Sequence, residues 1–584
     1  MNKRFFIYLV FISLLAVIAP ITVAFYYLPK LSQAVINVES TPKSAPAKSL
    51  SIAGGIVPHH LAAKPIIDQF WQKIGEQKPD TIILISPDHF KKGELSETPK
   101  IITVGLAESK FGDLIIAQDL LAKLDPKIFV FNSADLDLDH GIMAHLDFIK
   151  KYLPEVKILP FLVPADINQT QIADFTKQLA QHADSKVVVI ASVDFSHYLP
   201  RQAADLHDAK SLAAIVNFDE PQFPKLEVDC WQCLYSSCLY AQLEKKDKPE
   251  VLEHKNSLDF LAPLDLNKTT SYFTIIFKQS NLSIKKIGAK TILFVGDMML
   301  DRNVEALMNK NSFNYPFEKI GQFFKGLDLV FANLEGPIVK NPTQFPAHSL
   351  QFAFSPKVTT ALNFNGINLV SLANNHILNM GSDGLNQTRE FLKDSKINFA
   401  GDPNSCDKKF AYQNDYLVML AFNKTNSACT SEDIIKTITE IKAENKIKFL
   451  AVSIHWGNEY QTNNTDFQQK AGRQMIEAGA DVIIGHHPHV VENIEVYKNK
   501  LIFYSLGNFV FDQYFSKNTQ QGLAVGLEIN NDKLVYRLFP LQSKLSQPQL
   551  MEKSEADKFL ADLANRSSLG LKEKIRNGII KMNF

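Results

Sequence analysis

The chain has 584 residues, 46% hydrophobic and 21% charged, so its composition is that of a globular protein that is too long for a single core. The formal net charge is +0, which excludes the strongly basic balance that is typical of nucleic-acid-binding proteins. Five cysteines in a chain of this length exclude a disulfide-dense scaffold.

The N-terminal segment, residues 1–29, predicts a membrane span. Lys3 and Arg4 precede an uncharged stretch that is longer than the about 20 residues needed to cross a bilayer. The leading positive charges favour a cytoplasmic N-terminus and an exported remainder. A cleaved signal peptide is the alternative, because TVA before Phe25 resembles a cleavage site. We expect a single-pass cell-membrane protein, with its domains outside the cytoplasm on a polar linker, residues 30–50.

The rest of the chain predicts two α/β domains, residues 51–280 and 290–545. Each alternates strand-like apolar runs with helical patterns. The polar stretch QSNLSIKKIGAK separates one strand-like run from the next and indicates a linker between the domains. The last residues, 546–584, have an amphipathic pattern and predict a helical extension.

In the first domain, imidazole and carboxylate groups follow strand-like runs. GGIVPHH, TIILISPDH and KVVVIASVDFSH all end in such groups, and LDLDHGIMAHLDF adds two histidines. A buried strand is a poor place for idle polar side chains, so these groups indicate a ligand site. They are His59, His60, Asp88, His89, His140, His145, Asp194 and His197.

The motifs PHH, SPDH, DHG and SVDFSHY occur in the order found in the Memo-like family (AmmeMemoRadiSam system protein B), which is related to LigB-type extradiol dioxygenases. Residues 52–278 resemble this family. The resemblance implies one metal, held by three histidines with an aspartate and a further histidine beside them. The three ligands are His59, His89 and His197, and the neighbours are Asp194 and His140.

The same resemblance implies a reactive cysteine in DCWQC, where Cys230 and Cys233 are the candidates. Packing of these cysteines in a helix is the alternative, and a single C-x-x-C without a second pair is weak evidence for zinc. The chain reads PHHLAAK where the family usually continues PHAGY, so metal binding without catalysis stays open.

In the second domain, successive strand-like runs end in metal-competent groups. A single strand-end Asp or Asn is usually a helix cap or turn residue, but here five consecutive strand ends carry such groups. Imidazole, carboxylate and amide ligands suit Mn, Fe or Zn, and two metals about 3.5–4 Å apart need about this many ligands. The groups are Asp297, Asn333, Glu335, Asn375, His376, His455, His487 and His489.

The motifs GDMMLDR, FANLEGPI, SLANNHILNMG, HWGNEY, GADVIIGHHPHVVENIE and IFYSLGNFVFDQ resemble, in order, the CapA family of poly-γ-glutamate capsule biosynthesis proteins. This family is related to calcineurin-like metallophosphoesterases. The resemblance implies a four-layer α/β/β/α sandwich with a dinuclear site, and His376 as the acid that assists the leaving group. The implied ligands are Asp297, Glu335 as the bridge, Asn375, His455, His487 and His489, with His486 as a neighbour.

Two positions depart from the family pattern. Met299 stands where the superfamily usually has the histidine of Asp-x-His, which implies weaker binding of one metal, and Asn379 stands where the family commonly has Asp. Tyr460 and Arg302 are candidate substrate contacts, with surface or core roles as the alternative.

We therefore expect a membrane-anchored, extracytoplasmic, metal-dependent hydrolase that acts in the synthesis or processing of poly-γ-glutamate or another cell-envelope polymer. It would hold two divalent ions in the second domain, and the sequence does not decide between Mn, Fe and Zn. Whether the first domain also holds one metal ion stays open. The expected partners are the cytoplasmic membrane, the polymer or its precursor and capsule synthesis proteins, with no nucleic acid.

Two alternatives stay open. One is a non-enzymatic, metal-stabilised module that binds or guides an exported polymer, and the other is a redox metalloprotein that acts through its Memo-like domain. Export would also permit a disulfide between Cys406 and Cys429. The sequence leaves the substrate and the oligomeric state undetermined.

Overall fold

The computed structural model describes residues 50–90, 99–261, 267–279, 288–343, 345–346, 348–444, 449–531 and 533–583. Leu50–Phe584 form one compact unit. The predicted membrane segment, residues 1–29, lies outside the described residues, and within the described ranges no helix is both long and apolar enough to cross a membrane. We call residues 50–279 the first half of this unit and residues 288–583 the second half.

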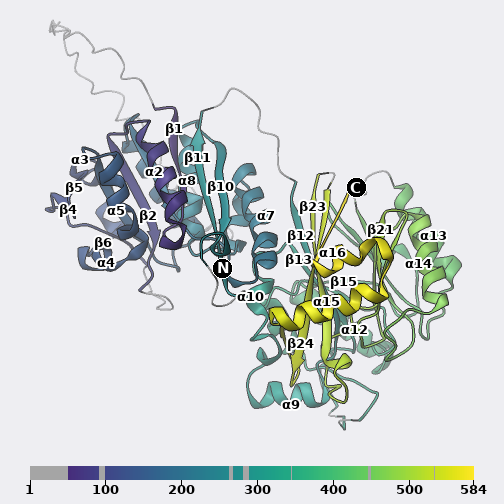
Figure 1. Cartoon of the computed structure of the whole chain (residues 1–584). Coiled ribbons are helices and arrows are strands. Elements are labelled where there is room, and N and C mark those ends of the chain that lie inside the picture. Colours follow the sequence, from purple (N-terminus) through teal and green to yellow (C-terminus); the bar gives the residue numbers. More distant parts are fainter. Residues whose placement is uncertain are drawn as a thin grey trace, which may run out of the picture. The chain divides into compact units, whose positions relative to one another are not determined.

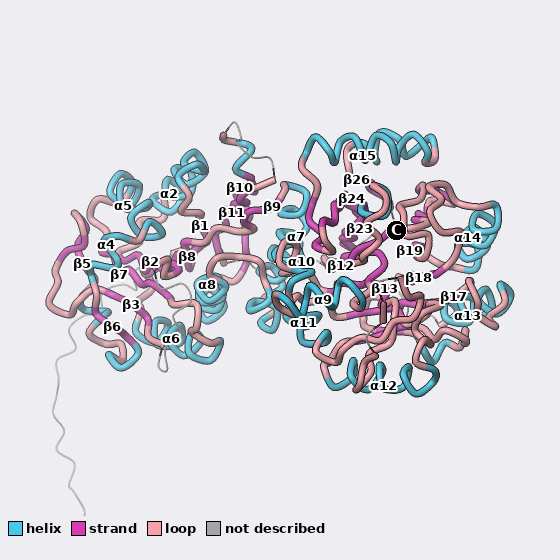
Figure 2. The backbone as a smooth tube through the Cα atoms, turned by 90° about the horizontal axis from the view of Figure 1, so that it is seen from below, coloured by secondary structure: helices cyan, strands magenta, loops and turns pink. Residues whose placement is uncertain are grey.

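The first half is built on one mixed sheet. Four neighbouring strands, β1, β8, β2 and β7, run parallel, so their carboxyl ends lie at the same edge. Helices cover both faces, with α2 (Lys64–Gly75) and α5 (His140–Tyr152) on one and α6 (Gln169–His182) and α8 (Trp231–Leu243) on the other (Figure 2). The strand order is β10 (Lys248–Asn256), β11 (Thr269–Lys278), β1 (Ile52–Val57), β8 (Val187–Ser192), β2 (Thr81–Pro87), β7 (Lys157–Val163), β3 (Ile101–Thr103) and β6 (Phe129–Phe131).

The second half contains two sheets. The first has the order β15 (Asn398–Ala400), β14 (Leu369–Ser371), β13 (Leu329–Leu334), β12 (Lys290–Met298), β23 (Gln521–Asn530), β24 (Lys533–Lys544) and β25 (Gln547–Leu550). The second has the order β16 (Tyr412–Gln413), β17 (Val418–Asn423), β18 (Leu450–His455), β19 (Val482–His486), β21 (Lys500–Phe503) and β20 (Ile494–Tyr497).

These two sheets pack face to face, with helices on their outer faces. Phe294 and Phe331 of the first sheet share an apolar cluster with Ile484 of the second. On the far side of the second sheet, Ile438 of α13 (Ser431–Ala443) and Met475 of α14 (Asp466–Ala478) form another cluster. Helices α9 (Arg302–Lys310) and α12 (Gly381–Asp394) bury apolar side chains against the first sheet. The layers therefore follow the order helix, sheet, sheet, helix.

The C-terminal residues belong to the first sheet of this half as well as to a helix. Helix α15 (Lys553–Arg566) occupies part of the region where the sequence predicts a helical extension. The chain then ends in β26 (Ile579–Asn583), which pairs antiparallel with β24. Ile580 and Met582 are buried while Lys581 is exposed, which is the two-residue alternation of a strand. The predicted helical extension therefore ends in a strand.

Helix α7 (Arg201–Asn217) joins the two halves in one core. Leu206 of this helix lies in an apolar cluster with Leu293 and Phe539 of the second half. A Cβ atom on Gly526 would lie 2.7 Å from a methyl carbon of Leu206, so the helix packs closely on β23 (Figure 1).

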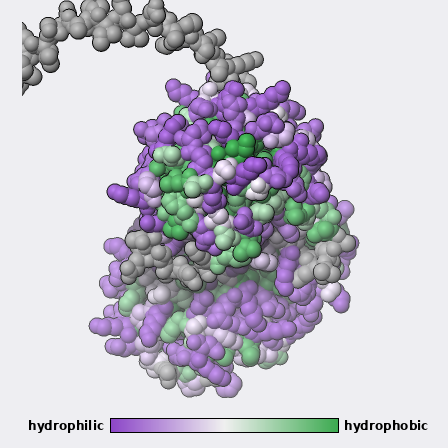
Figure 3. Space-filling model, turned by 90° about the vertical axis from the view of Figure 1, so that its left-hand side faces the viewer, coloured by the Kyte–Doolittle hydropathy of each residue, from purple (hydrophilic) through white to green (hydrophobic). Residues whose placement is uncertain are grey.

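Hydrophilic residues cover most of the face that Figure 3 shows. Apolar residues lie between them in smaller groups, as on other water-exposed surfaces.

Two disulfides are present among the described residues. One joins Cys406 to Cys429, the pair that the sequence analysis singled out, with the Cα atoms 5.8 Å apart. The other joins Cys230 to Cys233 at the start of α8, with the Cα atoms 5.3 Å apart.

Candidate metal centres

The first candidate centre lies at the carboxyl ends of the second half's central strands. Asp297 comes from β12, Glu335 follows β13 and His489 lies in the loop after β19. All three are buried, and their ligand atoms lie within 4.8 Å of one another. Asp297 Oδ2 is 3.5 Å from His489 Nδ1, and Glu335 Oε1 is 3.7 Å from His489 Nε2. The three groups fit one cation.

The other predicted ligands form an adjacent group. His455 ends β18, and its Nε2 lies 2.7 Å from Asn375 Oδ1. The His487 ring lies 4.8 Å from the His455 ring and 6.1 Å from the His489 ring, measured between centroids. The structure therefore brings all six predicted ligands of this half together in two neighbouring sets.

Several buried polar atoms of this centre have no hydrogen-bond partner among the described residues. They are both carboxylate oxygens of Glu335, both ring nitrogens of His486 and Nδ1 of His487. Burial raises the pKa of Glu335, and the charge of Asp297 raises it further. Burial without hydrogen bonds costs free energy that a bound cation would offset. The donor set therefore fits divalent metal ions.

The loop that carries the histidines is held in an uncommon backbone conformation. His487 has φ = 97° and His489 has φ = 59°, in the left-handed region that side-chain-bearing residues rarely adopt. The His487 N–H donates to Asp297 Oδ2 at 3.1 Å, and the Tyr460 N–H donates to Pro488 O at 2.8 Å. These bonds hold the loop against the strand ends. Uncommon backbone conformations of this kind cluster at functional sites.

His376 lies at the edge of this centre, with Nε2 3.8 Å from Glu335 Oε1. Asn379 Oδ1 accepts the Phe352 N–H at 2.9 Å and lies 3.2 Å from His376 Nδ1, so Nδ1 carries a proton and donates it. Nε2 therefore faces the centre. Burial lowers the pKa of His376 to about 4, so the imidazole must gain a second proton before Nε2 can serve as an acid.

The remaining predicted contacts differ in their accessibility. Tyr460 is 44% exposed, and its ring faces the His489 ring with centroids 6.2 Å apart. The Arg302 side chain is mostly buried, pairs with Asp512 and donates to Ser349 O at 2.7 Å. Tyr460 is thus accessible beside His489, whereas Arg302 has a structural ion pair.

Two further residues bear on this centre. The Met299 sulfur accepts the Asp301 N–H at 3.1 Å. At the position where the superfamily usually has the histidine of Asp-x-His, this chain therefore has a side chain that bonds to the backbone. Glu459 was not predicted from the sequence. It is exposed, and with His487 and His489 it forms a metal-competent group next to that of Asp297, Glu335 and His489. Its position in HWGNEY, four residues after the predicted ligand His455, was the signal in the sequence.

The second candidate centre lies at the carboxyl ends of the first half's strands. His59 and His89 come together as predicted, but the third imidazole within 4.8 Å is that of His140. His197 begins β9 (His197–Leu199), where it pairs with β11, and it lies outside the metal-competent groups found among the described residues.

Two carboxylates complete this centre. His59 Nε2 lies 3.5 Å from Asp194 Oδ2 and 3.3 Å from Asp229 Oδ2. Burial raises the pKa of Asp194, while burial and the nearby His89 lower the pKa of His59. On its far side, His89 is oriented by its Nδ1 contact with Asp139 Oδ1 at 2.9 Å. Asp229 was missed in the sequence because no strand-like run precedes it.

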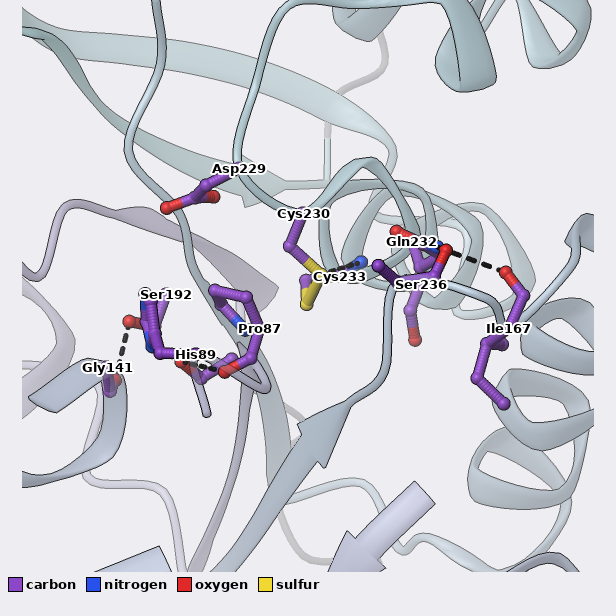
Figure 4. Close-up of a disulfide and its surroundings, with 12 residues drawn as sticks. Pro87, His89, Gly141, Ile167, Ser192, Asp229, Cys230, Gln232, Cys233 and Ser236 are labelled. Atoms are coloured by element: carbon purple, nitrogen blue, oxygen red, sulfur yellow. Dashed lines mark hydrogen bonds between the residues drawn. A yellow bond between two sulfur atoms is a disulfide. The ribbon is translucent and has the colours of Figure 1, made fainter. Parts of the chain in front are cut away.

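The predicted reactive cysteine is held in a disulfide. Cys230 follows Asp229 directly and caps α8, where its sulfur accepts the Cys233 N–H at 3.0 Å (Figure 4). The third cysteine of this helix, Cys238, is a buried thiol whose pKa is raised by burial.

Two family models match the chain. Residues 26–266 match the model "Memo-like protein", and residues 291–513 match the model "Bacterial capsule synthesis protein PGA_cap". These matches confirm both resemblances that the motifs indicated.

Curated relatives exist for each half. The capsule biosynthesis protein CapA of Bacillus anthracis is 29% identical over 282 residues, which cover 44% of this chain and 69% of that protein. The PGA biosynthesis protein CapA of Bacillus subtilis (strain 168) is 34% identical over 253 residues, which cover 39% of this chain and 65% of that protein. A MEMO1 family protein of Caldivirga maquilingensis is 24% identical over 238 residues, which cover 38% of this chain and 82% of that protein. The chain thus spans about two thirds of each CapA relative.

Proposed function

Because the chain joins a Memo-like segment to a segment of the bacterial capsule synthesis family, we propose that its second half is a dinuclear metal-dependent hydrolase. Its substrate would be poly-γ-glutamate, another cell-envelope polymer or a phosphorylated precursor. The layered arrangement of two sheets between helices supports a four-layer, metallophosphoesterase-like domain. The observation that carries the proposal is the set of buried, unsatisfied carboxylate and imidazole atoms around Glu335.

Each ligand has a role that its position supports. Asp297 and His489 would hold one ion, and Asn375, His455 and His487 would hold the other. Glu335 would be shared, because both of its oxygens lack a protein hydrogen-bond partner among the described residues. Two such ions would supply a bound water of lowered pKa and charge stabilisation at the reacting centre.

Neighbouring residues would orient these groups and the substrate. The Asn333 amide donates to Asp297 Oδ1 at 2.8 Å and fixes that carboxylate. Once it has gained a second proton at Nε2, His376 would donate that proton to the leaving group, and the exposed Tyr460 ring would contact the substrate. This arrangement assigns binding, orientation and proton transfer to separate side chains.

The cellular setting is part of the proposal. Residues 1–29 would anchor the chain in the cytoplasmic membrane, with both halves outside. Two disulfides among the described residues support this, because disulfides persist in oxidising compartments. The partners would be the membrane, the polymer and other capsule synthesis proteins, and the first half would hold one further metal ion.

A second candidate function is a metal-stabilised module that binds or guides an exported polymer without cleaving it. Met299 favours this alternative, because its sulfur bonds the backbone at the position where the superfamily usually has a ligand imidazole.

The full chain in detergent tests the proposal. We expect Mn²⁺-dependent hydrolysis of a generic phosphodiester or of poly-γ-glutamate, together with two ions bound in the second half. Glu335→Gln should lower the metal content and abolish hydrolysis, because it removes the charge that offsets the repulsion between two cations. If the wild type bound two ions but hydrolysed neither substrate, the result would favour the binding module.

Glu492→Gln is the matched control. Glu492 is also buried in the second half, and burial raises its pKa to about 8, so glutamine resembles its protonated form. This variant should keep both ions and full activity. If Glu335→Gln also kept both, the dinuclear assignment would be wrong.

A further inference from the structure

A chain of buried hydrogen bonds stands behind His59 in the first half. The Trp71 indole N–H donates to His145 Nδ1 at 3.1 Å, and His145 Nε2 lies 3.1 Å from Ser192 Oγ. Ser192 Oγ in turn lies 3.0 Å from His59 Nδ1. Trp71, His145 and Ser192 are fully buried, and none of them belongs to a metal-competent group.

The direction of each bond in this chain follows from the number of protons available. An indole nitrogen can only donate, so His145 Nδ1 accepts and its proton is on Nε2, which donates to Ser192. The single Ser192 hydroxyl proton goes to Gly141 O at 2.6 Å. Ser192 Oγ can therefore only accept from His59, and the His59 proton must be on Nδ1.

This tautomer leaves His59 Nε2 with a bare lone pair. That nitrogen faces the carboxylate oxygens of Asp194 and Asp229 at 3.5 and 3.3 Å. The Asp194 N–H donates to Asp229 Oδ2 at 3.0 Å, so one backbone donor lies beside these three acceptor atoms. The three residues form a metal-competent group, and a cation among them would offset the cost of burying the two carboxylates. A ligand histidine usually bonds a second partner through its other nitrogen, and that partner fixes the ring.

Helix α5 connects this chain to the ligands. It begins at His140, which belongs to the metal-competent group, and one turn later it supplies His145 to the hydrogen-bond chain. A Cβ atom on Gly141 would lie 1.9 Å from Ser86 Oγ, so only glycine lets the helix start pack this closely. The same helix thus sets both sides of His59.

We propose that Trp71, His145 and Ser192 are positioning residues that fix the His59 tautomer, so that Nε2 binds a divalent transition-metal ion together with Asp194 and Asp229. This rests on the proposed metal in the first half and is independent of the hydrolase assignment in the second. Removal of the Ser192 hydroxyl leaves His59 Nδ1 without an acceptor, so the proton can move to Nε2 and compete with the metal.

The test is a Co²⁺ titration of the chelator-treated full chain in detergent, followed by visible absorption. The His59→Ala isotherm is subtracted, so that only binding that depends on His59 is compared. Ser192→Ala should weaken this binding about 10- to 100-fold, the usual effect of losing the partner that orients a ligand. Trp71→Phe should weaken it in the same direction, and it replaces Ser192→Ala if that variant does not fold.

Thr176→Val is the matched control, because Thr176 is also fully buried in the first half and its hydroxyl donates to Ile172 O at 2.7 Å. It should leave Co²⁺ affinity unchanged. Three results would each overturn the proposal: identical isotherms for wild type and His59→Ala, unchanged affinity in Ser192→Ala, or an equal loss in Thr176→Val. The Glu335-dependent binding of the second half is measured separately, so failure of one assignment leaves the other standing.

Discussion

Lys210 in the first half pairs with Asp328 in the second, with Nζ 3.4 Å from Oδ1 and side-chain exposures of only 4% and 11%. Burial lowers the pKa of Lys210, and the nearby Asp328 carboxylate opposes that effect. Asp328 also accepts the Thr291 N–H at 2.9 Å, which ties the pair to the start of β12. The two halves therefore share a buried ion pair as well as an apolar core.

The first prediction concerns this pair. Lys210→Met should destabilise the protein by about 3–5 kcal/mol, because it leaves the Asp328 charge buried without its partner. Thermal unfolding of the full chain measures the effect. The double variant Lys210→Met with Asp328→Asn should recover much of the loss, because it removes the buried charge and keeps an acceptor for the Thr291 N–H. Lys177→Met removes an exposed pair with Asp174 and should change little.

The second prediction concerns pH. His207 is buried, its Nε2 lies 3.0 Å from Phe323 O, and burial lowers its pKa to about 4. The unfolded state binds a proton from about pH 6.5 downward while the folded state does not, so stability falls as the pH drops towards 4. This one group accounts for up to about 3 kcal/mol.

His207→Gln should flatten the stability curve between pH 6.5 and 4, measured by thermal unfolding. Ser237→Ala, which removes a buried hydroxyl that donates to Gly55 O, should instead lower the melting temperature equally at every pH. A His207→Gln curve parallel to that of the wild type would contradict the prediction.

The third prediction separates a proton donor from a ligand. His376→Ala should leave the metal content of the second half unchanged and lower the hydrolysis rate about 10²- to 10⁴-fold. His348→Ala, at an exposed position, should change neither quantity. If His376→Ala lost an ion, the imidazole would have to be reassigned as a ligand.

The fourth prediction concerns the disulfide between Cys406 and Cys429, which spans 23 positions of sequence. Replacing both residues with serine should destabilise the protein by roughly 3 kcal/mol, because the unfolded chain regains the entropy of an open loop. Thermal unfolding of the variant and the wild type measures this. Free thiols at both positions in protein taken from its native envelope would contradict the pairing.

The sequence was sufficient to predict that the candidate ligands of the second half lie close together, because parallel strands bring their carboxyl ends to one edge. Asp297 and His455 lie at the ends of their strands, Glu335 follows its strand directly and His489 lies in the loop after β19, so chain order was enough to group them. Their pairing into two sets could not be predicted, because it depends on which way each side chain leaves its loop.

In the first half, chain order alone does not predict which side chains lie together. His197 follows a strand-like run as His89 does, yet it begins an edge strand, whereas His140 begins a helix that turns back over the strand ends. Asp229 lies next to an isolated bridge between Phe195 and Val228, a long-range pairing without a local pattern. The hydrogen-bond chain behind His59 was equally hidden, because Trp71, His145 and Ser192 are far apart in sequence.

The packing of helix α7 also bears on how the protein is degraded. A protease that cut the backbone between residues 279 and 288 would not release two proteins, because Leu206 and Lys210 would stay inserted against the second half. The product would be a nicked complex, held together without a peptide link. Made alone, the first fragment would expose the apolar face of α7 and the second fragment the surface that this face covers, so each would become a target for chaperones and proteolysis.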